Sequence, residues 1–369
     1  MPTSLSLLNA FHDLPDPRRT QGQDHRLTDL LVIAVCTLLV GGESAYDMED
    51  FGRAREDWLR TFLPLPKGIA SHDTFNRLFQ ALDPAAFAGT FAYWTQGLRE
   101  SLGREVVALD GKAARRAVAA GQCPRHLVSA WATASGLTLG QLQVAEKSNE
   151  ITAVPALLRQ LELAGCIVTA DALHCQKTIA REIVEADADY VLALKGNQAT
   201  AHEEIKTYLD DAVARSAPEL AALTTVDKGH GRLETRRYWQ SEALGWFADR
   251  AAWPGLRSVG LVEATRELND KVSGERRYYL SSLPRDIALF AKAVRGHWAV
   301  ENQCHWVLDI VFREDQSRAR TGHAVANLGL LRRLALNLLR QEKALARGTR
   351  RKQLHAALNP DYLRQLLKI

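Results

Sequence analysis

The chain has 369 residues, of which 46% are hydrophobic and 24% charged, which is typical of an ordinary globular protein with a sizeable core and two or three domains. The longest apolar run, which starts at Leu30, is too short to span a bilayer, and no convincing signal peptide precedes it. Five cysteines without a CxxC pair indicate neither a disulfide framework nor a zinc ribbon, so we expect a cytoplasmic protein with reduced thiols.

The net charge of +4 is unevenly distributed along the chain. Residues 313–369 contain 13 Lys and Arg against 4 Asp and Glu, a local charge of +9, which leaves −5 for residues 1–312. The densest cluster is RGTRRKQ, with Arg350, Arg351 and Lys352, and a nucleic-acid backbone is a partner that such a cluster would neutralise. Basic helix faces are also common on soluble proteins, so charge alone leaves a polyanion partner and a solvated surface equally open.

Residues 1–103 carry helical patterns throughout, with helices predicted at 27–40 and 46–62. Ser71 is a candidate N-cap for the next helix, and Asp83 and Pro84 mark the start of another. Apolar residues at three- and four-residue spacing form a stripe at Phe75, Leu78, Phe79 and Leu82. These patterns predict an all-α domain whose aromatic residues form its core.

From Glu105 the pattern changes to strands. Three strands are predicted at 105–112, 126–134 and 139–147, and helices at 154–163, 177–185 and 200–209 then alternate with strands at 166–172 and 190–196. A meander followed by this alternation predicts a mixed sheet with helices on its faces, in the order expected of an RNase H-like core.

Residues 222–283 interrupt this core with short half-exposed strands, in which Arg and Glu alternate with Leu, Tyr and Val. We therefore predict an α/β protein in five segments. They are an all-α N-terminal domain (1–103), the first part of the core (104–221), a β-rich insertion (222–284), the completion of the core (285–341) and a basic helical tail (342–369).

Two aspartates are placed where predicted strands end, each followed by a small residue: Asp110 before Gly111, and Asp171 before Ala172. Sites in open α/β sheets gather at strand ends, where carboxylates converge on one edge. An aspartate after a strand also commonly begins a turn or caps a helix. Two such residues in one sheet favour a site, and hard oxygen ligands without cysteine favour Mg²⁺ or Mn²⁺.

A stripe of ionisable residues follows the insertion, at four-residue spacing along a single predicted helix over 294–312: His297, Glu301, His305 and Asp309. On a straight helix the first three stay within an arc of roughly 80°, while Asp309 lies farther round. Glu301 is thus able to face the strand ends. A metal site of two histidines and Glu301 on the helix alone, and a solvated ladder of ion pairs, are the alternatives.

Several segments resemble those of the ISAs-type insertion-sequence transposases, also called H-repeat-associated proteins. The most specific is RGHWAVENQCHWVLDIVFREDQSRAR, and six others occur in the family's order over nearly the whole chain: LPDPRR, SHDTFNRLFQALDP, VALDGKAAR, TADALHCQK, LALKGNQ and HGRLETRRY. The resemblance implies a DDE transposase related to the IS-four group, with an RNase H-like core and a β-rich insertion. It also implies the catalytic triad Asp110, Asp171 and Glu301.

Phosphodiester cleavage by such a triad uses two divalent ions, Mg²⁺ or Mn²⁺, which clamp the attacking and leaving oxygens of an in-line displacement. In this hypothesis Asp110 bridges the ions, Asp171 holds one and Glu301 the other. The expected partners are double-stranded DNA, as terminal inverted repeats and target, and a second protomer on DNA, with no membrane and no small-molecule substrate.

Neighbouring residues are candidates for supporting roles. His297, His305 and Asp309 are candidates beside the metal ions, and Trp298 and Trp306 either stack on an unpaired base or pack against the inserted strands. Contacts with the DNA backbone are expected from residues close to strand ends or in basic segments: Lys112, Arg115, Arg116, Lys195, Asn197, Arg313, Arg350, Arg351 and Lys352.

The resemblance to the broader IS-four group is incomplete. Val294, His297 and Leu308 stand at the positions of that group's Tyr, Arg and Lys, so their DNA-contact roles do not transfer. Two other functions stay open: an inactive or domesticated DNA-binding protein on this fold, and an RNase H-like nuclease without strand transfer.

Overall fold

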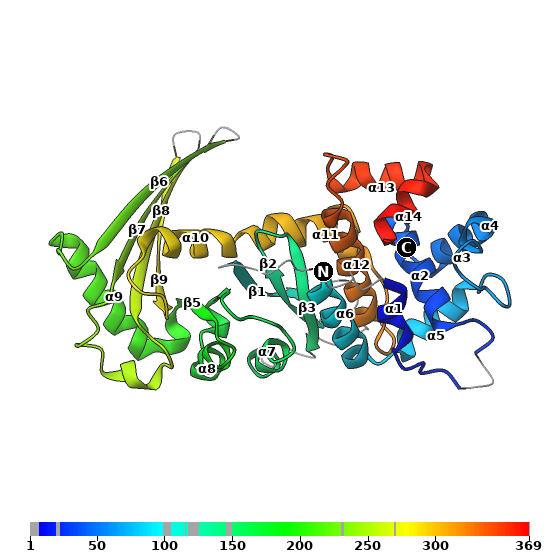
Figure 1. Cartoon of the computed structure of the whole chain (residues 1–369). Helices are drawn as coiled ribbons and strands as arrows, with labels where there is room; N and C mark the ends of the chain where they lie inside the picture. The colour runs from blue at the N-terminus through cyan, green and yellow to red at the C-terminus, as the bar shows by residue number, and fades with distance from the viewer. Residues whose placement is uncertain are drawn as a thin grey trace. The chain divides into compact units, whose positions relative to one another are not determined.

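The computed structural model describes residues 7–19, 23–98, 105–114, 116, 125–144, 150–229, 232–268 and 271–368 (Figure 1). The chain divides into two compact units. Unit 1 comprises Met1–Ser101, Gly111–Ala153 and Val300–Ile369, and unit 2 comprises Leu102–Asp110 and Val154–Ala299. In the described part of the chain, no helix is long and apolar enough to cross a membrane.

The N-terminal part of unit 1 is helical, as predicted. Its helices are α1 (Leu7–His12), α2 (Leu27–Leu39), α3 (Ala45–Ala54), α4 (Glu56–Leu59), α5 (His72–Ala81) and α6 (Pro84–Leu98). Helix α2 is buried along nearly its whole length, as its apolar sequence requires. At the start of α3, the Ser44 side chain accepts a hydrogen bond from the Asp47 amide in a capping box, and the single helix predicted at 46–62 is interrupted at Arg55.

Three further helices complete unit 1: α12 (Ala324–Gln341), α13 (Thr349–Leu358) and α14 (Pro360–Leu367). Helix α12 packs against α2, α5, α6 and strand β3 (Leu137–Val144). It is buried on almost every side, and its buried residues include Arg332 and Arg333. The C-terminal segment is therefore folded into the helical unit rather than being a free basic tail.

The sheet begins in unit 1 with the antiparallel strands β2 (His126–Ala132) and β3 (Leu137–Val144). Strand β1 (Val106–Ala113) belongs to both units, because its first residues are part of unit 2 and its last three are part of unit 1. In unit 2, β1, β4 (Ile167–Ala170) and β5 (Asp189–Leu194) pair in parallel. Helices α7 (Glu150–Leu158) and α8 (Lys177–Glu185) precede β4 and β5, and α9 (Ala199–Ala214) follows β5. Helix α7 begins and ends earlier than the predicted range 154–163.

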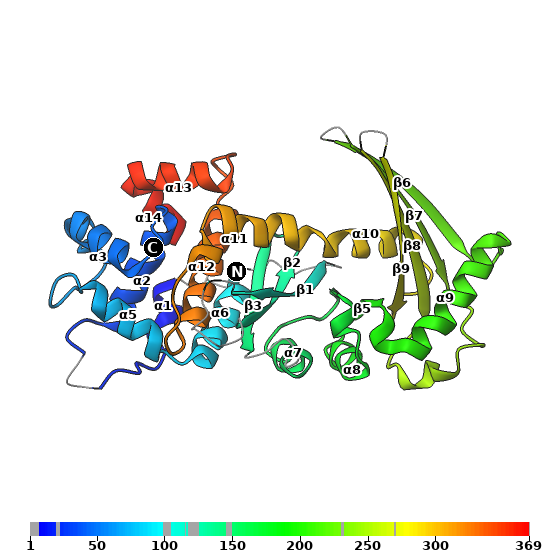
Figure 2. The ribbon, with the colours of Figure 1, turned by 180° about the vertical axis from the view of Figure 1, so that it is seen from behind.

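The β-rich segment of unit 2 contains four strands, where the sequence indicated three: β6 (Ala221–Gly229), β7 (Arg232–Ser241), β8 (Ser258–Leu268) and β9 (Lys271–Ser281). They form an antiparallel meander, and β9 pairs with β5, so the meander extends the core sheet (Figure 2). The strand order is β3-β2-β1-β4-β5-β9-β8-β7-β6. The sequence did not single out β6, whose residues alternate between partly and fully exposed in a polar edge strand.

Helix α10 (Ile287–His297) packs against β4, β5, β6 and β7 in unit 2. Its Phe290 is fully buried and meets the Tyr279 ring edge to face, with 5.6 Å between ring centroids. Position 260 must be glycine, because a Cβ there would lie 2.3 Å from the Phe290 ring. This contact fixes the start of the segment that carries the ionisable stripe.

Candidate catalytic site

Two aspartates follow the last paired residues of neighbouring parallel strands in unit 2. Leu109 of β1 pairs with Ala170 of β4, and Asp110 and Asp171 are the next residues along each strand. Strand β1 itself continues to Ala113, whereas its pairing with β4 ends at Leu109. Because neighbouring strands are about 4.8 Å apart, the two carboxylates start from adjacent backbone positions.

Asp171 forms the helix cap that was the alternative stated for it from the sequence, and its carboxylate is also half exposed. Its side chain accepts a hydrogen bond from the amide of His174 at 3.3 Å and caps a short 3₁₀-helix, Ala172–His174. Its Oδ1 also lies 2.9 Å from Nδ1 of His174, which is buried, while 47% of the Asp171 side chain is exposed. One carboxylate oxygen is thus engaged by His174 and the side chain still reaches solvent.

His174 also influences the charge of Asp171. Burial raises the pKa of the Asp171 carboxyl, but the hydrogen bonds and charge of His174 outweigh it, so the pKa lies below its ordinary value. Asp171 is therefore ionised at neutral pH. His174 was not predicted from the sequence, although its position three residues after Asp171 was the available signal.

The loop after Asp171 is held by residues that follow β5. Asn197 Nδ2 donates a hydrogen bond to the carbonyl of Ala172 at 2.5 Å, and Gln198 donates to the carbonyl of Cys175 at 3.1 Å. Asn197, expected to contact DNA, therefore binds the loop that presents Asp171. Lys195, at the end of β5, is exposed.

His297 lies at the end of α10, on the side of strand β4. Its Nδ1 is 3.2 Å from the hydroxyl of Thr169, two residues before Asp171. Burial lowers the pKa of His297 to about 4, although the charge of Asp171 partly opposes this shift. His297 is thus a neutral imidazole near neutral pH, which does not favour a cationic contact with phosphate.

Glu301 does not lie on the straight helix that the sequence predicted. Helix α10 ends at His297, residues Glu301–His305 form a π-helical turn, and α11 (Trp306–Ile310) follows. A π-turn has wider i to i+5 hydrogen bonding and is frequent at functional sites. It changes the angular spacing of the stripe, so the predicted 80° arc does not apply. Glu301 is exposed and belongs to unit 1, while Asp110 and Asp171 belong to unit 2.

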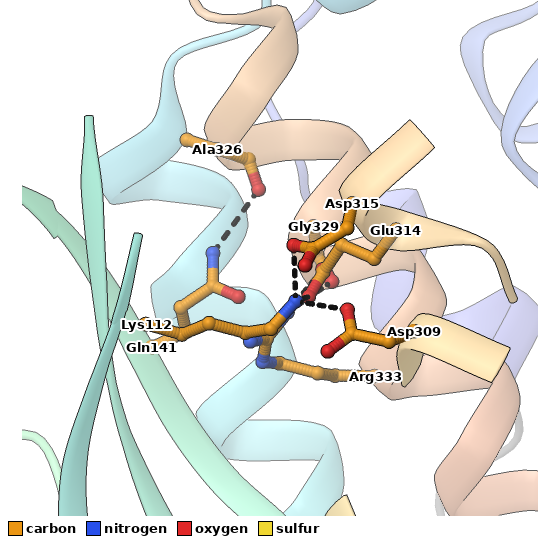
Figure 3. Close-up of polar contacts among 8 residues, drawn as sticks. All are labelled: Lys112, Gln141, Asp309, Glu314, Asp315, Ala326, Gly329 and Arg333. Carbon is orange, nitrogen blue, oxygen red and sulfur yellow. Dashed lines mark hydrogen bonds and ion pairs between the residues drawn. The ribbon is translucent and has the colours of Figure 1, made fainter. Parts of the chain in front are cut away.

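The other acid of the stripe, Asp309, is part of a buried ionic cluster in unit 1 (Figure 3). Lys112 Nζ forms an ion pair with Asp309 and lies 3.0 Å from carboxylate oxygens of both Glu314 and Asp315. Arg333 approaches the second oxygen of Glu314 at 2.8 Å. We call these five residues the Lys112 cluster.

Charges within the Lys112 cluster stabilise one another. Burial lowers the pKa of Lys112, but the charges of Glu314 and Asp309 raise it above its ordinary value. Burial also raises the pKa of Glu314, but Arg333 and Lys112 hold it at about 2. Burial likewise lowers the pKa of the adjacent His305, to about 4, and the charges of Arg333 and Lys112 add to that shift. The sequence missed this cluster, although the adjacent arginines inside the apolar helix α12 were a signal.

Two lysines that were predicted to contact DNA are buried in the structure. The Lys112 side chain is 10% exposed and is occupied by three carboxylates. Lys352 is 7% exposed, donates to the carbonyl of Leu339 at 2.9 Å and pairs with Glu342 at 3.1 Å, so it caps the end of α12. Neither ammonium group is free to reach a phosphate.

The remaining predicted residues have different surroundings. Trp298 packs on Arg277 of β9, with 4.2 Å between the guanidinium and the ring, in line with packing against the inserted strands. Trp306 is 56% exposed. Arg313 is exposed in a left-handed conformation and lies 3.3 Å from Glu43.

Arg350 and Arg351 are exposed on α13, and Arg116 is exposed as well. Arg115 lies outside the described residues. Within the described ranges, no group of three or more histidine, cysteine, aspartate or glutamate side chains could hold a metal ion.

The candidate acids lie within a segment that matches a known protein family. The family model described as "Transposase DDE domain" matches residues 101–338, which include Asp110, Asp171 and Glu301. The chain belongs to the DDE transposase family. The preceding residues 8–95 match the model described as "DDE_Tnp_1-associated", which covers the N-terminal helices of this transposase-family chain.

Relatives extend over the whole transposase-family chain. It is 37% identical over 368 residues to "Putative transposase YncI" of Escherichia coli O157:H7, covering 98% of this chain and 94% of that protein. It is 35% identical over 370 residues to "H repeat-associated putative transposase YhhI" of Escherichia coli K12, covering 98% and 97%. Among solved structures, a piggyBac transposase synaptic complex with hairpin DNA aligns over 95% of this chain and 76% of that chain, at 11% identity and a TM-score of 0.45.

Proposed function

We propose that this chain is an insertion-sequence transposase that cleaves DNA strands and transfers them by in-line phosphodiester displacement. The observation that carries the proposal is the placement of Asp110 and Asp171 directly after the paired residues Leu109 and Ala170 of parallel strands. Membership of the DDE transposase family supports the same reaction. We assign Glu301 as the third acid on the basis of its place in the family-like segment.

Within the described residues no three histidine, cysteine, aspartate or glutamate side chains are gathered into a metal site, so the proposal of a pair of divalent ions rests on the chemistry of the donor atoms alone. Asp171 is half exposed, and its lowered pKa keeps it ionised at neutral pH. Carboxylate oxygens without thiolate ligands suit Mg²⁺ or Mn²⁺. Asp110, Asp171 and Glu301 would hold the two ions, which when bound would activate the attacking oxygen and stabilise the leaving oxygen.

The chain's own contribution is to orient these carboxylates before DNA arrives. His174 engages one oxygen of Asp171, and Asn197 fixes the loop that follows it. His297, held at Thr169, places a neutral ring beside Asp171. Such preorganisation lowers the cost of placing ligands correctly during the reaction.

The proposed reaction implies its partners. Its substrates are double-stranded DNA carrying the element's terminal inverted repeats and a second, target DNA. Coordinated cutting of two ends implies two protomers on the DNA. In a prokaryotic cell these substrates place the protein in the cytoplasm, at the nucleoid when bound.

The test is metal-dependent nicking of a supercoiled plasmid that carries the element's own ends, in Mg²⁺ or Mn²⁺. We compare the wild type with Glu301→Gln and with Glu242→Gln, a matched change at an exposed glutamate after β7. We expect cleavage at the ends by the wild type and by Glu242→Gln, and none by Glu301→Gln. Equal cleavage by all three would remove Glu301 from the triad.

The same assay separates the alternatives. Joined products from a second plasmid indicate strand transfer, whereas an RNase H-like nuclease leaves only free ends. A wild-type protein that binds the ends without cutting them would overturn the catalytic proposal in favour of a DNA-binding protein.

A further inference from the structure

Unit 1 contains a hollow of about 500 Å³ that the proposed catalytic residues do not use. Its walls come from α3, α5, the segment 318–321 and the first turns of α12. The walls include two segments that the sequence analysis singled out for their resemblance to transposases, SHDTFNRLFQALDP and the end of the segment around Glu301. We call it the Arg77 hollow.

The polar lining of the Arg77 hollow is strongly basic. Arg77, Arg318 and Arg320 line it, against a single acid, Asp73, so the lining carries a net charge of +2. Arg77 and Arg318 are exposed, and in the described part of the chain neither forms an ion pair with a carboxylate. Their positive charge is therefore directed to solvent rather than used within the fold.

A close backbone contact and a hydrogen bond join two walls of the hollow. Gly322 has a φ of +55°, and a Cβ there would be 2.4 Å from the carbonyl oxygen of Gln80, so the backbone of this segment touches the end of α5. The amide of His323 donates to the same Gln80 carbonyl at 3.0 Å. The backbone that carries Arg318 is thus joined to the end of the helix that carries Arg77.

A buried amide reinforces this junction. Asn327 is fully buried on α12, and its Nδ2 donates to the carbonyls of Phe79 and Leu82 at 2.9 Å each. These bonds satisfy carbonyls at the end of α5 that have no partner within the helix. The hollow is therefore a preformed feature with rigid walls.

The remaining polar lining suits phosphate oxygens. Asn76 and Gln80 bring side-chain amides, and Thr321 brings a hydroxyl, all in the same hollow as the arginines. Arginine, amide and hydroxyl donors are the groups that contact the phosphates and sugars of duplex DNA. A concave surface with an excess of positive charge also concentrates a polyanion.

We propose that the Arg77 hollow binds the phosphate backbone of the duplex on which this protein acts, an inference that rests on the proposed function for its choice of DNA as partner. The hollow is a positioning surface, formed by N-terminal helix α5 and the segment before α12. It explains why uncompensated arginines are placed on two segments so far apart in sequence. Backbone contacts are independent of base sequence, so the element's ends need not be known for a test.

The test measures binding of a short fluorescent duplex of arbitrary sequence by anisotropy, at several salt concentrations, with EDTA present. The variant is the full chain with Arg77→Gln and Arg318→Gln. Each phosphate contact contributes roughly 0.9 to the slope of log affinity against log salt, so we expect the slope to become shallower by about 2. Affinity at low salt should fall roughly tenfold or more.

The matched control carries Arg181→Gln and Arg250→Gln, two exposed arginines on α8 and after Phe247 that remove the same charge elsewhere. It should keep the wild-type slope, and circular dichroism should show all three proteins folded. A double variant with the slope of the wild type, or no shallower than that of the control, would overturn the proposal. Because metal is absent, this binding result is independent of whether the protein cuts DNA.

Discussion

The carboxylates of the Lys112 cluster and the carboxylate of Asp171 differ in their exposure to solvent and in the groups that neutralise them. In the Lys112 cluster of unit 1, Asp309, Glu314 and Asp315 are matched by Lys112 and Arg333, and the Glu314 side chain is only 7% exposed. In unit 2, the side chain of Asp171 is 47% exposed.

Asp171 is paired with the buried His174, whose Nδ1 lies 2.9 Å from Oδ1 of the carboxylate. Carboxylates whose oxygens are taken by lysine and arginine hold a fold together. A carboxylate that is held by a histidine and exposed to solvent, as Asp171 is, can still bind a ligand.

The largest effect should come from removing the open carboxylate. Asp171→Asn keeps the shape of the side chain but removes a negative ligand, and we expect plasmid nicking to fall by roughly a thousandfold or more. Asp309→Asn is the matched change in the Lys112 cluster, and nicking should persist in that variant. Nicking is measured under single-turnover conditions, and both proteins should unfold cooperatively.

The opposite pattern would break the comparison. If Asp309→Asn abolished nicking while Asp171→Asn preserved it, the buried cluster would be the reactive one and the strand-end pair structural. A loss in both variants without unfolding would place Asp309 in the reaction as well.

The next effect concerns stability. Lys112→Met leaves Asp309, Glu314 and Asp315 facing one another with their principal cation removed, and breaking such a buried pair costs about 3–5 kcal/mol. Lys195→Met is the control, because Lys195 is exposed at the end of β5 and should change the free energy of unfolding by no more than about 0.5 kcal/mol. Urea unfolding measures both. Equal midpoints for the two variants would show that the Lys112 cluster adds nothing to stability.

A smaller effect should follow from pH. Burial lowers the pKa of His305 from 6.5 to about 4, so between these values the unfolded chain binds a proton that the folded chain does not. The unfolded chain also binds a proton that the folded chain does not at Glu314, between pH 4.5 and about 2. Burial raises the pKa of Glu314, but the charges of Arg333 and Lys112 outweigh that effect. His297, whose pKa burial also lowers to about 4, behaves in the same way as His305. Stability should therefore fall in two stages on acidification below about pH 6.5.

The two stages can be separated. Glu314→Gln removes the lower stage and should leave the decline that begins near pH 6.5. Urea midpoints across this range, for the wild type and this variant, give the comparison. A wild-type stability that rose on acidification would contradict both assignments.

The strand-end aspartates could be located from the sequence because local signals are sufficient there. Short apolar runs end at Asp110 and at Asp171, and parallel pairing then places the ends of those runs side by side. The helix cap formed by Asp171 was also a stated alternative. Neither feature depends on contacts with distant residues.

The Lys112 cluster could not be located in this way. Its carboxylates lie 197 to 203 residues after Lys112, and nothing in the sequence near Lys112 distinguishes a buried lysine from one that faces DNA. The same holds for Lys352, which lies within a basic segment but is buried at the end of α12. Charge counts report how many cations a segment has and not which of them are already neutralised.

The sequence by itself determined the helices of the described N-terminal residues, the alternating core and the place of the two aspartates, because the repeat of apolar residues follows directly from helix and strand geometry. Tertiary structure alone decided that the β-rich segment extends the core sheet through β5 and β9, and that Glu301 lies in a π-turn. It also decided that Lys112 and Lys352 are structural while Arg77 and Arg318 face a hollow. Pairing, burial and charge compensation depend on residues far apart in the chain, and those partners exist only after folding.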